Sequence, residues 1–294
     1  MTVTLNPALD LTYTVDALVP QTTHRVRAIA ERPGGKGLNV ASVLHTLGEP
    51  VLATGFLGGT TGAAVQALVD ASGLPSAFVS IAGETRRTVT VVDAADATGL
   101  WEPGPTVTGP EWTAFVRHFC ELLGRATVVV LSGSLPGGLE HDAYAILIRL
   151  ARERGVPTVL DTSGAPLRHG IAAGPDVAKP NEQELADLSD LPAGGTALVV
   201  SLGHRGLIAH TGAGSWRATP LEVVAGNPTG AGDACVAALA RGQRDRTPWP
   251  ELLADAVALS AAAVAAPVAG AIDIDRYRSY RQHGGAQPDV QPHP

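Results

Sequence analysis

The feature that most constrains the fold is a set of short, unbroken apolar runs that end in polar or glycine-rich turns. Residues 128–131, 157–161 and 197–203 are three such runs, and segments with helical periodicity, such as 112–123 and 144–154, lie between or beside them. Unbroken apolar strands that alternate with helices are typical of a parallel sheet with helices on both faces. We therefore predict an α/β fold with binding sites at the carboxyl ends of its strands.

Two other segments alternate apolar and polar residues, which is the pattern of strands with one solvated face. These are residues 11–15 and 86–92, and residues 26–28 between them could add a third strand. We interpret this part of the chain as a small β lid over the mouth of the main sheet. Whether such a lid moves, or is simply a solvent-exposed sheet, stays open at this point.

The chain thus divides into a core, a lid and a tail. The last residues are rich in Gly, Pro and Gln, and we predict that they are disordered. The predicted parts are the core (1–10, 33–83 and 103–283), the lid (11–32 and 84–102) and the tail (284–294).

Length, charge and cysteine content exclude several classes of protein. A chain of 294 residues fits one large α/β domain with a small appendage. Cys120 and Cys235 form no CxxC pair, which argues against a disulfide framework or a zinc site. A net charge of −7 leaves no general basic surface for nucleic acid. Without a signal peptide, and with an apolar stretch at 254–266 too short to span a bilayer, we predict a cytoplasmic protein that binds no membrane.

The strongest chemical signal is the segment 229–233, Thr-Gly-Ala-Gly-Asp, which precedes an apolar helical stretch at 234–240. Glycines at the start of a helix leave its first amides bare, and the positive end of the helix dipole then faces any anion bound there. Asp233 would lie beside that anion, where it could take a proton from an attacking hydroxyl group. The alternative is an ordinary turn in which Asp233 stabilises the helix N-terminus. The segment is neither a P-loop nor a dinucleotide-binding motif.

Lysine usage favours the chemical interpretation. Of the 21 Lys and Arg residues only two are lysines, Lys36 in the Gly-Gly-Lys-Gly segment 34–37 and Lys179 after the predicted buried strand 175–178. A compact ammonium group suits a point contact with a phosphate where a planar guanidinium does not fit. The alternative is chance combined with codon usage.

Other polar residues are placed where a site could use them. Ser134 lies in the glycine-rich turn after the apolar run 128–131, and Asp10 follows the first predicted strand. Arg86 and Arg25 lie on the predicted lid, where a guanidinium could clamp a phosphate. Taken singly, Asp10 could equally be a turn residue, and each arginine could be a solvated lid charge.

Four motifs in this order carry a family resemblance. They are Gly-Gly-Lys-Gly-Leu-Asn-Val-Ala at 34–41, Ser-Gly-Ser-Leu-Pro at 132–136, Lys-Pro-Asn-x-x-Glu at 179–184 and Gly-Ala-Gly-Asp at 230–233, with Thr-Leu-Asn-Pro-Ala-Leu-Asp at 4–10 before them. Together they resemble the ribokinase-like carbohydrate kinases, the phosphofructokinase B family, and the resemblance runs from Thr4 to about Asp273. Gly-Gly-Lys-Gly with Glu84-Thr85-Arg86 looks most like the branch that acts on phosphorylated hexoses, which contains 1-phosphofructokinase and tagatose-6-phosphate kinase.

The resemblance implies a three-layer Rossmann-like core, a β lid often used for homodimerisation, and ATP and Mg²⁺ as cofactors, and it leaves open activation by a monovalent cation. It implies a hexose phosphate kinase that converts fructose 1-phosphate to fructose 1,6-bisphosphate; the alternatives are a tagatose-6-phosphate or fructose-6-phosphate kinase and a sugar-phosphate-binding regulator without catalysis. The implied roles are the base (Asp233), the anion hole (Gly230, Ala231, Gly232), sugar hydroxyl contacts (Asp10, Gly35, Asn39), contacts to the substrate phosphate (Lys36, Arg86, Ser134, and Arg25 across a dimer), nucleotide contacts (Lys179, Asn181, Glu184, Ser201, Gly203) and indirect Mg²⁺ binding (Glu184).

Three features depart from the family pattern. Thr88 stands where this branch usually has Asn, and Pro228 removes an amide donor before the anion hole. The segment between Glu184 and Ser201 is about one helix shorter than usual. None of these departures removes the base, the anion hole or Lys36.

Overall fold

The computed structural model describes residues 1–188, 195–220, 222–282 and 289–292. Within these residues the main sheet has ten strands in the order β14-β13-β12-β11-β10-β9-β8-β1-β4-β5, and the strands from β11 to β5 run parallel. The parallel strands are β1 (Thr2–Thr4), β4 (Ala53–Gly58), β5 (Val79–Ile81), β8 (Val129–Ser132), β9 (Thr158–Asp161), β10 (Val177–Ala178) and β11 (Ala197–Ser201). The antiparallel strands at the other edge are β12 (Leu207–Thr211), β13 (Gly214–Thr219) and β14 (Asp289–Pro292).

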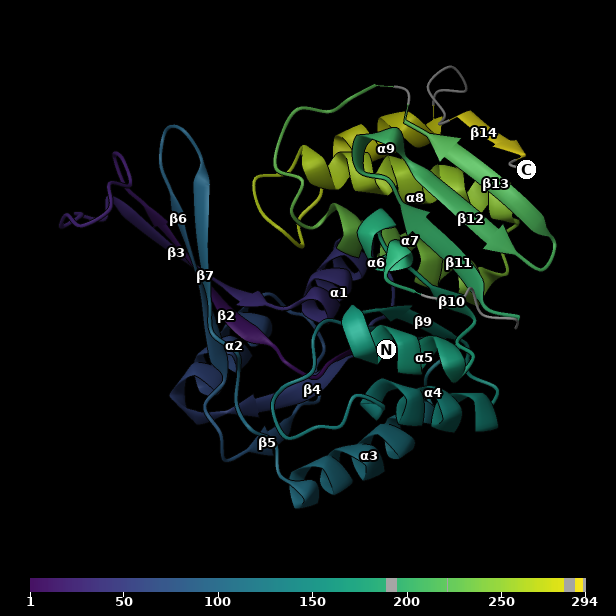
Figure 1. The fold of residues 1–294 in the computed structure, drawn as a ribbon, viewed down its shortest axis with the longest axis horizontal. Coiled ribbons are helices and arrows are strands. Elements are labelled where there is room, and N and C mark those ends of the chain that lie inside the picture. Colours follow the sequence, from purple (N-terminus) through teal and green to yellow (C-terminus); the bar gives the residue numbers. More distant parts are fainter. Residues whose placement is uncertain (189–194, 221, 283–288, 293–294) are drawn as a thin grey trace.

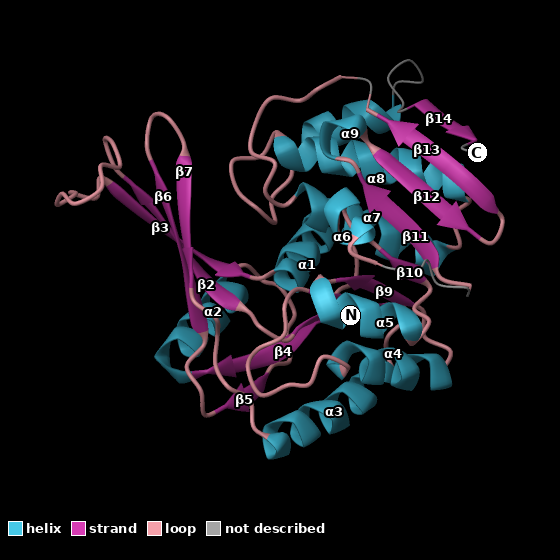
Figure 2. Cartoon of the chain, in the orientation of Figure 1, coloured by secondary structure: helices cyan, strands magenta, loops and turns pink. Residues whose placement is uncertain are grey.

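Helices cover both faces of this sheet (Figure 2). Successive residues of a strand point to opposite faces, so Val129 and Leu131 pack in one hydrophobic cluster while Val130 packs in the other. The predicted three-layer α/β core, with a mostly parallel sheet, is confirmed. One face is covered by α1 (Lys36–Thr46), α2 (Gly59–Ala71), α7 (Ala231–Asp245) and α8 (Trp249–Val264), with α9 (Ile274–Gln282) against α8, and the other by α3 (Gly109–Leu123), α4 (Ala143–Glu153) and α5 (Gly164–Ala172).

A second, four-stranded sheet projects from the core beside α1 and α2 (Figure 1). Its order is β3 (Ala28–Gly34), β2 (Ala8–Thr14), β6 (Arg86–Val92) and β7 (Ala97–Trp101). The register places Arg32, Asp10, Thr88 and Trp101 in one row across the four strands, so these side chains share a face. We call this second sheet the lid sheet.

The C-terminal tail differs from expectation where it is described. Residues 289–292 form β14 and pair with β13, so the prediction of disorder is wrong for these four residues. The physical reason is that β13 would otherwise be an edge strand with unpaired backbone groups, which favour the addition of a further strand. Residues 284–288 and 293–294 of the predicted tail lie outside the described residues, as does part of the short segment after Glu184.

The carboxyl ends of the central parallel strands bring polar residues to one edge of the sheet. Asn6 follows β1, Ser134 follows β8, Asp161 ends β9 and Lys179 follows β10. Gly133 N donates to Asp161 O at 2.9 Å, which ties two of these turns together. None of the described helices is long and apolar enough to span a membrane.

Candidate active site

The predicted anion hole lies at the start of α7. Gly230 precedes the helix with φ of 93°, in the left-handed region, and a Cβ atom there would lie 2.8 Å from Ala269 Cα. Both the conformation and the close approach therefore require glycine at this position. Ala231 N, the first amide of α7, donates to Pro228 O at 3.2 Å. No side-chain cap covers the amides that follow, because Gly230 has no side chain, and these are available to an anion.

Asp233 lies in the first turn of α7 and is only 7% exposed. Asn39 Nδ2 from α1 donates a hydrogen bond of 2.8 Å to Asp233 Oδ2, which fixes the orientation of the carboxylate. Burial, together with the charge of Asp161, raises the pKa of Asp233 to about 7, and the Asn39 hydrogen bond and the two lysines only partly oppose this. A carboxylate with a pKa near neutrality is well matched to the role of a general base.

Asp161 is a site residue that the sequence analysis did not single out. It is 1% exposed, and its carboxylate contacts Lys179 Nζ at 3.3 Å, Lys36 Nζ at 3.4 Å and Ser132 Oγ at 3.1 Å. Burial alone would raise the pKa of Asp161, but the charges of Lys179 and Lys36 and the hydrogen bonds outweigh it and hold the pKa low. Asp161 therefore carries a buried negative charge that brings the two lysines of the chain to one point. Its position at the polar end of the run 157–161 was the available sequence signal.

Lys179 is the buried member of the lysine pair. It is 4% exposed, and although burial lowers its pKa, the charge of Asp161 more than compensates and raises it, so that Lys179 is a cation. A Cβ atom on Gly232 would lie 3.6 Å from Lys179 Nζ, so the ammonium group is adjacent to the predicted anion hole. Lys36 is more exposed and lies next to the turn at Gly133. The two lysines therefore flank Asp161 on two sides, one toward the anion hole and one toward the Ser134 turn.

Asp10 lies on the lid sheet, where it faces the chain at Gly34. A Cβ atom on Gly34 would lie 2.1 Å from Asp10 Cγ, so only glycine leaves room for this carboxylate. Thr88 Oγ1 donates to Asp10 Oδ1, and the residue that departs from the family pattern therefore holds Asp10 in place. Burial raises the pKa of Asp10, opposed by the Thr88 hydrogen bond and by the charges of Arg86 and Arg32.

Arg32 is a second residue that the sequence analysis missed. Its Nη2 donates to Ala269 O at 3.2 Å, which connects the lid sheet to the loop beside the anion hole. That loop also contacts α1, since a Cβ on Gly270 would lie 3.0 Å from Asn39 Oδ1. No sequence pattern indicated this contact, because it joins residues 237 positions apart.

The remaining predicted phosphate contacts converge in part. Ser134 lies at the turn that adjoins Lys36, and Arg86 Nε donates to Asn6 O at 3.2 Å. Asn6 Nδ2 in turn donates to Ser134 Oγ at 3.2 Å. Asn6 was quoted only within the motif 4–10, yet it connects two of the predicted contacts. Arg25, by contrast, is exposed and belongs to the connection between β2 and β3, and it makes no hydrogen bond or ion pair with these residues. This connection runs at the outer end of the lid sheet (Figure 1).

The segment Glu84–Arg86 anchors the lid to α2. The carboxylate of Glu84 accepts hydrogen bonds from the Thr60 and Thr61 amides at the start of this helix. Hydrogen bonds from the side chain and the amide of Thr61, with smaller contributions from Thr60, lower the pKa of Glu84 to about 2. Thr85 Oγ1 accepts from Gly58 N at 2.9 Å. This segment of the motif is thus explained by anchoring, which leaves Arg86 to face the site.

A cavity of about 390 Å³ adjoins the start of α7 and has mostly apolar walls. Ser201 and Gly203 line it beside Gly232, as do Pro228 and Cys235. A largely apolar pocket next to an anion hole can hold a flat ring joined to phosphates. The remaining apolar walls come from Leu207, Val223, Val224, Val257, Ala261 and Val264.

Asn181 and Glu184 form a capping box at the start of α6 (Glu182–Ala186). Asn181 Oδ1 accepts from Glu184 N, and Glu184 Oε2 accepts from Asn181 N, both at 2.8 Å. One carboxylate oxygen of Glu184 is therefore engaged locally, and the other is not hydrogen-bonded within the cap. Among the described residues no group of three His, Cys, Asp or Glu side chains could hold a metal by itself. The second carboxylate oxygen of Glu184 is a ligand of the kind that Mg²⁺ takes, together with nucleotide phosphates and water.

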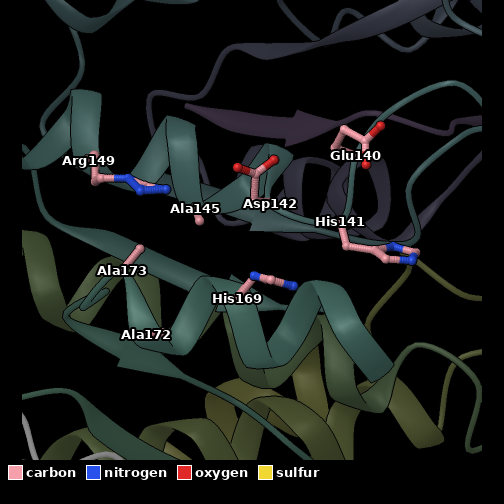
Figure 3. Close-up of a pocket in the computed structure, with 8 residues that line it drawn as sticks. All are labelled: Glu140, His141, Asp142, Ala145, Arg149, His169, Ala172 and Ala173. Atoms are coloured by element: carbon pink, nitrogen blue, oxygen red, sulfur yellow. The ribbon is translucent and has the colours of Figure 1, made fainter.

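A second hollow, of about 480 Å³, lies between the start of α4 and α5 (Figure 3). Its polar side chains are Glu140, His141, Asp142, Arg149 and His169, and none of them is a predicted site residue. It lies on the face of the sheet opposite α7, so it is separate from the cluster around Asp161.

Comparisons with known proteins agree with the motifs. A family model described as "pfkB family carbohydrate kinase" matches residues 3–275. The tagatose-6-phosphate kinase of Staphylococcus epidermidis is 34% identical over 296 residues, which cover 94% of this chain and 96% of that protein. Phosphofructokinase-2 from Escherichia coli, solved in complex with potassium, has a TM-score of 0.89 at 27% identity and covers 95% of this chain and 96% of its own. A possible 1-phosphofructokinase from Thermotoga maritima has a TM-score of 0.85 at 28% identity and covers 100% of this chain and 99% of its own.

Proposed function

The chain belongs to the pfkB family of carbohydrate kinases, and on that premise we propose that it phosphorylates fructose 1-phosphate to fructose 1,6-bisphosphate. Membership of the family supports the general activity, which is that of an ATP-dependent kinase acting on sugar phosphates. Tagatose 6-phosphate and fructose 6-phosphate are the alternative acceptors, and each is named in a similar protein or its structure.

The observation that carries the proposal is the buried Asp233 at the N-terminus of α7, beside the cluster of Asp161 with two lysines. In the proposed reaction Asp233 takes the proton of the attacking sugar hydroxyl. The hydroxyl oxygen forms a bond to the γ-phosphorus of ATP as the bond to the bridging oxygen breaks, and ADP leaves with that electron pair. A hydroxyl is a poor nucleophile, so positioning and charge neutralisation supply most of the rate.

The chain's own cations have distinct places in this scheme. Lys179, adjacent to the amides of residues 230–232, would hold the phosphates of the nucleotide at the anion hole. Lys36 lies on the Ser134 side, where it would meet the phosphate already on the acceptor. Lys36 shares the single carboxylate of Asp161 with Lys179, so a phosphate on the acceptor would supply a second negative charge for the two cations, which favours a phosphorylated acceptor. Asp10 and Asn39 would bind the sugar hydroxyls between these two points.

Mg²⁺, when bound, would neutralise charge on the transferred phosphate. Asp161 and Glu184 are the carboxylates that could approach it, directly or through water. The potassium complex of the Escherichia coli relative motivates a comparison of turnover in K⁺ and Na⁺ salts.

We also propose a homodimer through the lid sheet. Three large apolar side chains on this sheet are at least 61% exposed: Trp101 on the face that carries Asp10, and Ile29 and Leu100 on the opposite face. Exposed apolar groups concentrated on one element are typical of protein interfaces. Replacing Trp101 by Glu should shift the mass measured by light scattering from dimer to monomer; a monomeric unsubstituted protein would contradict the dimer. The cytoplasmic location also stays a prediction.

The test of the function is ADP release measured against a panel of hexoses and hexose phosphates. We expect the highest kcat/KM with fructose 1-phosphate. A higher value with tagatose 6-phosphate or fructose 6-phosphate would replace the acceptor and keep the reaction. Saturable binding of a hexose phosphate without turnover of any member of the panel would favour the regulator and exclude the kinase.

A further inference from the structure

Asn6 is a buried polar residue at the meeting point of three segments. It follows β1 and is 5% exposed. Its side chain contacts Pro103, in the segment that follows β7, and Ser134, in the turn that follows β8. Its main-chain oxygen accepts from Arg86 Nε at 3.2 Å. Asn6 thus contacts Ser134 and Arg86, two of the residues that the family resemblance assigns to the phosphate of the acceptor.

The contacts determine which way the Asn6 amide faces. The Pro103 carbonyl can only accept a hydrogen bond, so the atom 3.1 Å from it must be the amide nitrogen Nδ2. The same Nδ2 lies 3.2 Å from Ser134 Oγ, which therefore accepts from Asn6. A hydroxyl that accepts in this direction must point its own hydrogen elsewhere. Ser134 is exposed at the site, so its O–H is left to donate to a ligand.

Arg86 is held by the main chain at Asn6 and not by its side chain. Nε of Arg86 is engaged by the Asn6 carbonyl, and Nη1 lies at a long 3.4 Å from Glu102 O. A guanidinium anchored through Nε presents its two terminal nitrogens as a fork, which matches two oxygens of a phosphate.

The side-chain oxygen of Asn6 indicates that this residue does not serve to stabilise the fold. Asn6 Oδ1 is buried with no hydrogen-bond partner among the described residues, and a Cβ on Gly104 would lie 2.2 Å from it. A buried acceptor without a partner destabilises a folded protein. Local costs of this kind are expected at functional sites.

We propose that the side chain of Asn6 is a positioning group that sets Ser134 as a hydrogen-bond donor toward the phosphate already carried by the acceptor sugar, beside Arg86, which the main-chain oxygen of the same residue holds. This inference rests on the proposed function, because it concerns recognition of a phosphorylated acceptor. It goes further by assigning specificity for the phosphate to a residue that need not touch the phosphate.

The test is Asn6→Asp, which keeps the size of the side chain and removes its donor. The aspartate would accept from Ser134, so the hydroxyl would no longer donate to the ligand, and its charge would repel the phosphate. We expect the KM for the best hexose phosphate to rise tenfold or more, with the KM for ATP and kcat at saturating acceptor changed less than threefold. Slow turnover of the unphosphorylated sugar, where it is measurable, should be unaffected.

The matched control is Thr54→Val, which removes a buried side-chain donor from β4 that bonds Ala77 O and contacts neither Ser134 nor Arg86. If Asn6→Asp does not fold, as judged by thermal unfolding, Asn6→Ala replaces it. In that case a double-mutant cycle of Asn6→Ala with Ser134→Ala tests whether the two residues act together. We expect the double variant to raise the acceptor KM little more than Ser134→Ala alone.

Equal rises in the KM for acceptor and for ATP, a profile like that of Thr54→Val, or fully additive effects in the cycle would each overturn the role of Asn6. Failure of the proposed function is distinguishable, since the unsubstituted protein would then turn over no hexose phosphate at all.

Discussion

The core and the lid approach the same site with different kinds of residues. On the core side Asp161, Lys179 and Asp233 are at most 7% exposed and lie in one buried electrostatic cluster. On the lid side Arg86 and Arg32 are only partly buried, and both are held by main-chain oxygens instead of carboxylates. Fixed buried charges suit stabilisation of a transition state, whereas accessible groups on a projecting sheet suit capture of the acceptor. We therefore expect substitutions in the core to lower kcat and substitutions facing the lid to raise the KM of the acceptor.

The largest effect should come from Asp233→Asn. Removal of a general base typically lowers the rate by about 10²–10⁴-fold, and the amide retains the size of the carboxylate. We expect kcat to fall within this range while calorimetry shows that hexose phosphate still binds. Asp245→Asn, at the far end of the same helix, is the control and should leave kcat unchanged. A kcat near normal for Asp233→Asn would remove Asp233 from the mechanism and break the assignment of chemistry to the core.

Lys36→Ala should give the next largest effect, because Lys36 lies at the boundary between core and lid. A hydrogen bond to a charged group contributes about 1.5–3 kcal/mol, so we expect the KM for the hexose phosphate to rise roughly 10- to 100-fold. The KM for ATP should change much less, since Lys179 and the anion hole serve the nucleotide. Arg87→Ala, which removes an exposed cation paired with Glu102, is the control. Equal rises for both substrates would contradict the assignment of Lys36 to the acceptor.

The pH dependence probes the core alone. With a pKa of about 7, Asp233 is increasingly protonated below neutrality, so kcat/KM should fall about tenfold per pH unit well below pH 7 and level off above it. The dependence of the free energy of unfolding on pH tests the same pKa independently. The pKa of Asp233 is raised in the folded state, so the stabilising contribution of Asp233 is complete below about pH 4 and is lost as pH rises through about 7. Asp233→Asn should therefore gain more in melting temperature over the unsubstituted protein at pH 8 than at pH 5. An equal gain at both values would contradict the raised pKa.

The same contrast explains what could be predicted from the sequence. The parallel core follows from local patterns, since runs such as 128–131 are apolar on both faces. Asp233, Lys36 and Lys179 stand out because their types and neighbours are unusual within the chain. Asp161 was missed because an acidic residue at the end of a strand is common, and only the fold shows that it binds both lysines. Asn6 and Arg32 were missed because their importance lies in contacts across 128 and 237 positions, which no local pattern reports. The strand at 289–292 depends on the exposed edge of β13 rather than on its own composition.

The smallest predicted effect tests whether the two regions are connected at all. Arg32 donates to Ala269 O, and the loop that carries Ala269 packs against Gly230 at the anion hole. A single hydrogen bond contributes about 0.5–1.5 kcal/mol, so Arg32→Ala should lower kcat roughly 2- to 10-fold by loosening that loop. Arg32→Lys, which can still donate to the carbonyl, should recover part of the loss.

The matched control is Arg27→Ala. Arg27 directly precedes β3, is exposed, and its side chain pairs only with Asp16 among the described residues. If Arg32→Ala raises the acceptor KM and leaves kcat at the level of the control, the lid acts on the acceptor alone and the division between the regions is complete. If kcat falls as expected, a residue of the lid helps to hold the anion hole, and closure of the lid over the acceptor is then coupled to the placement of the phosphate that is transferred.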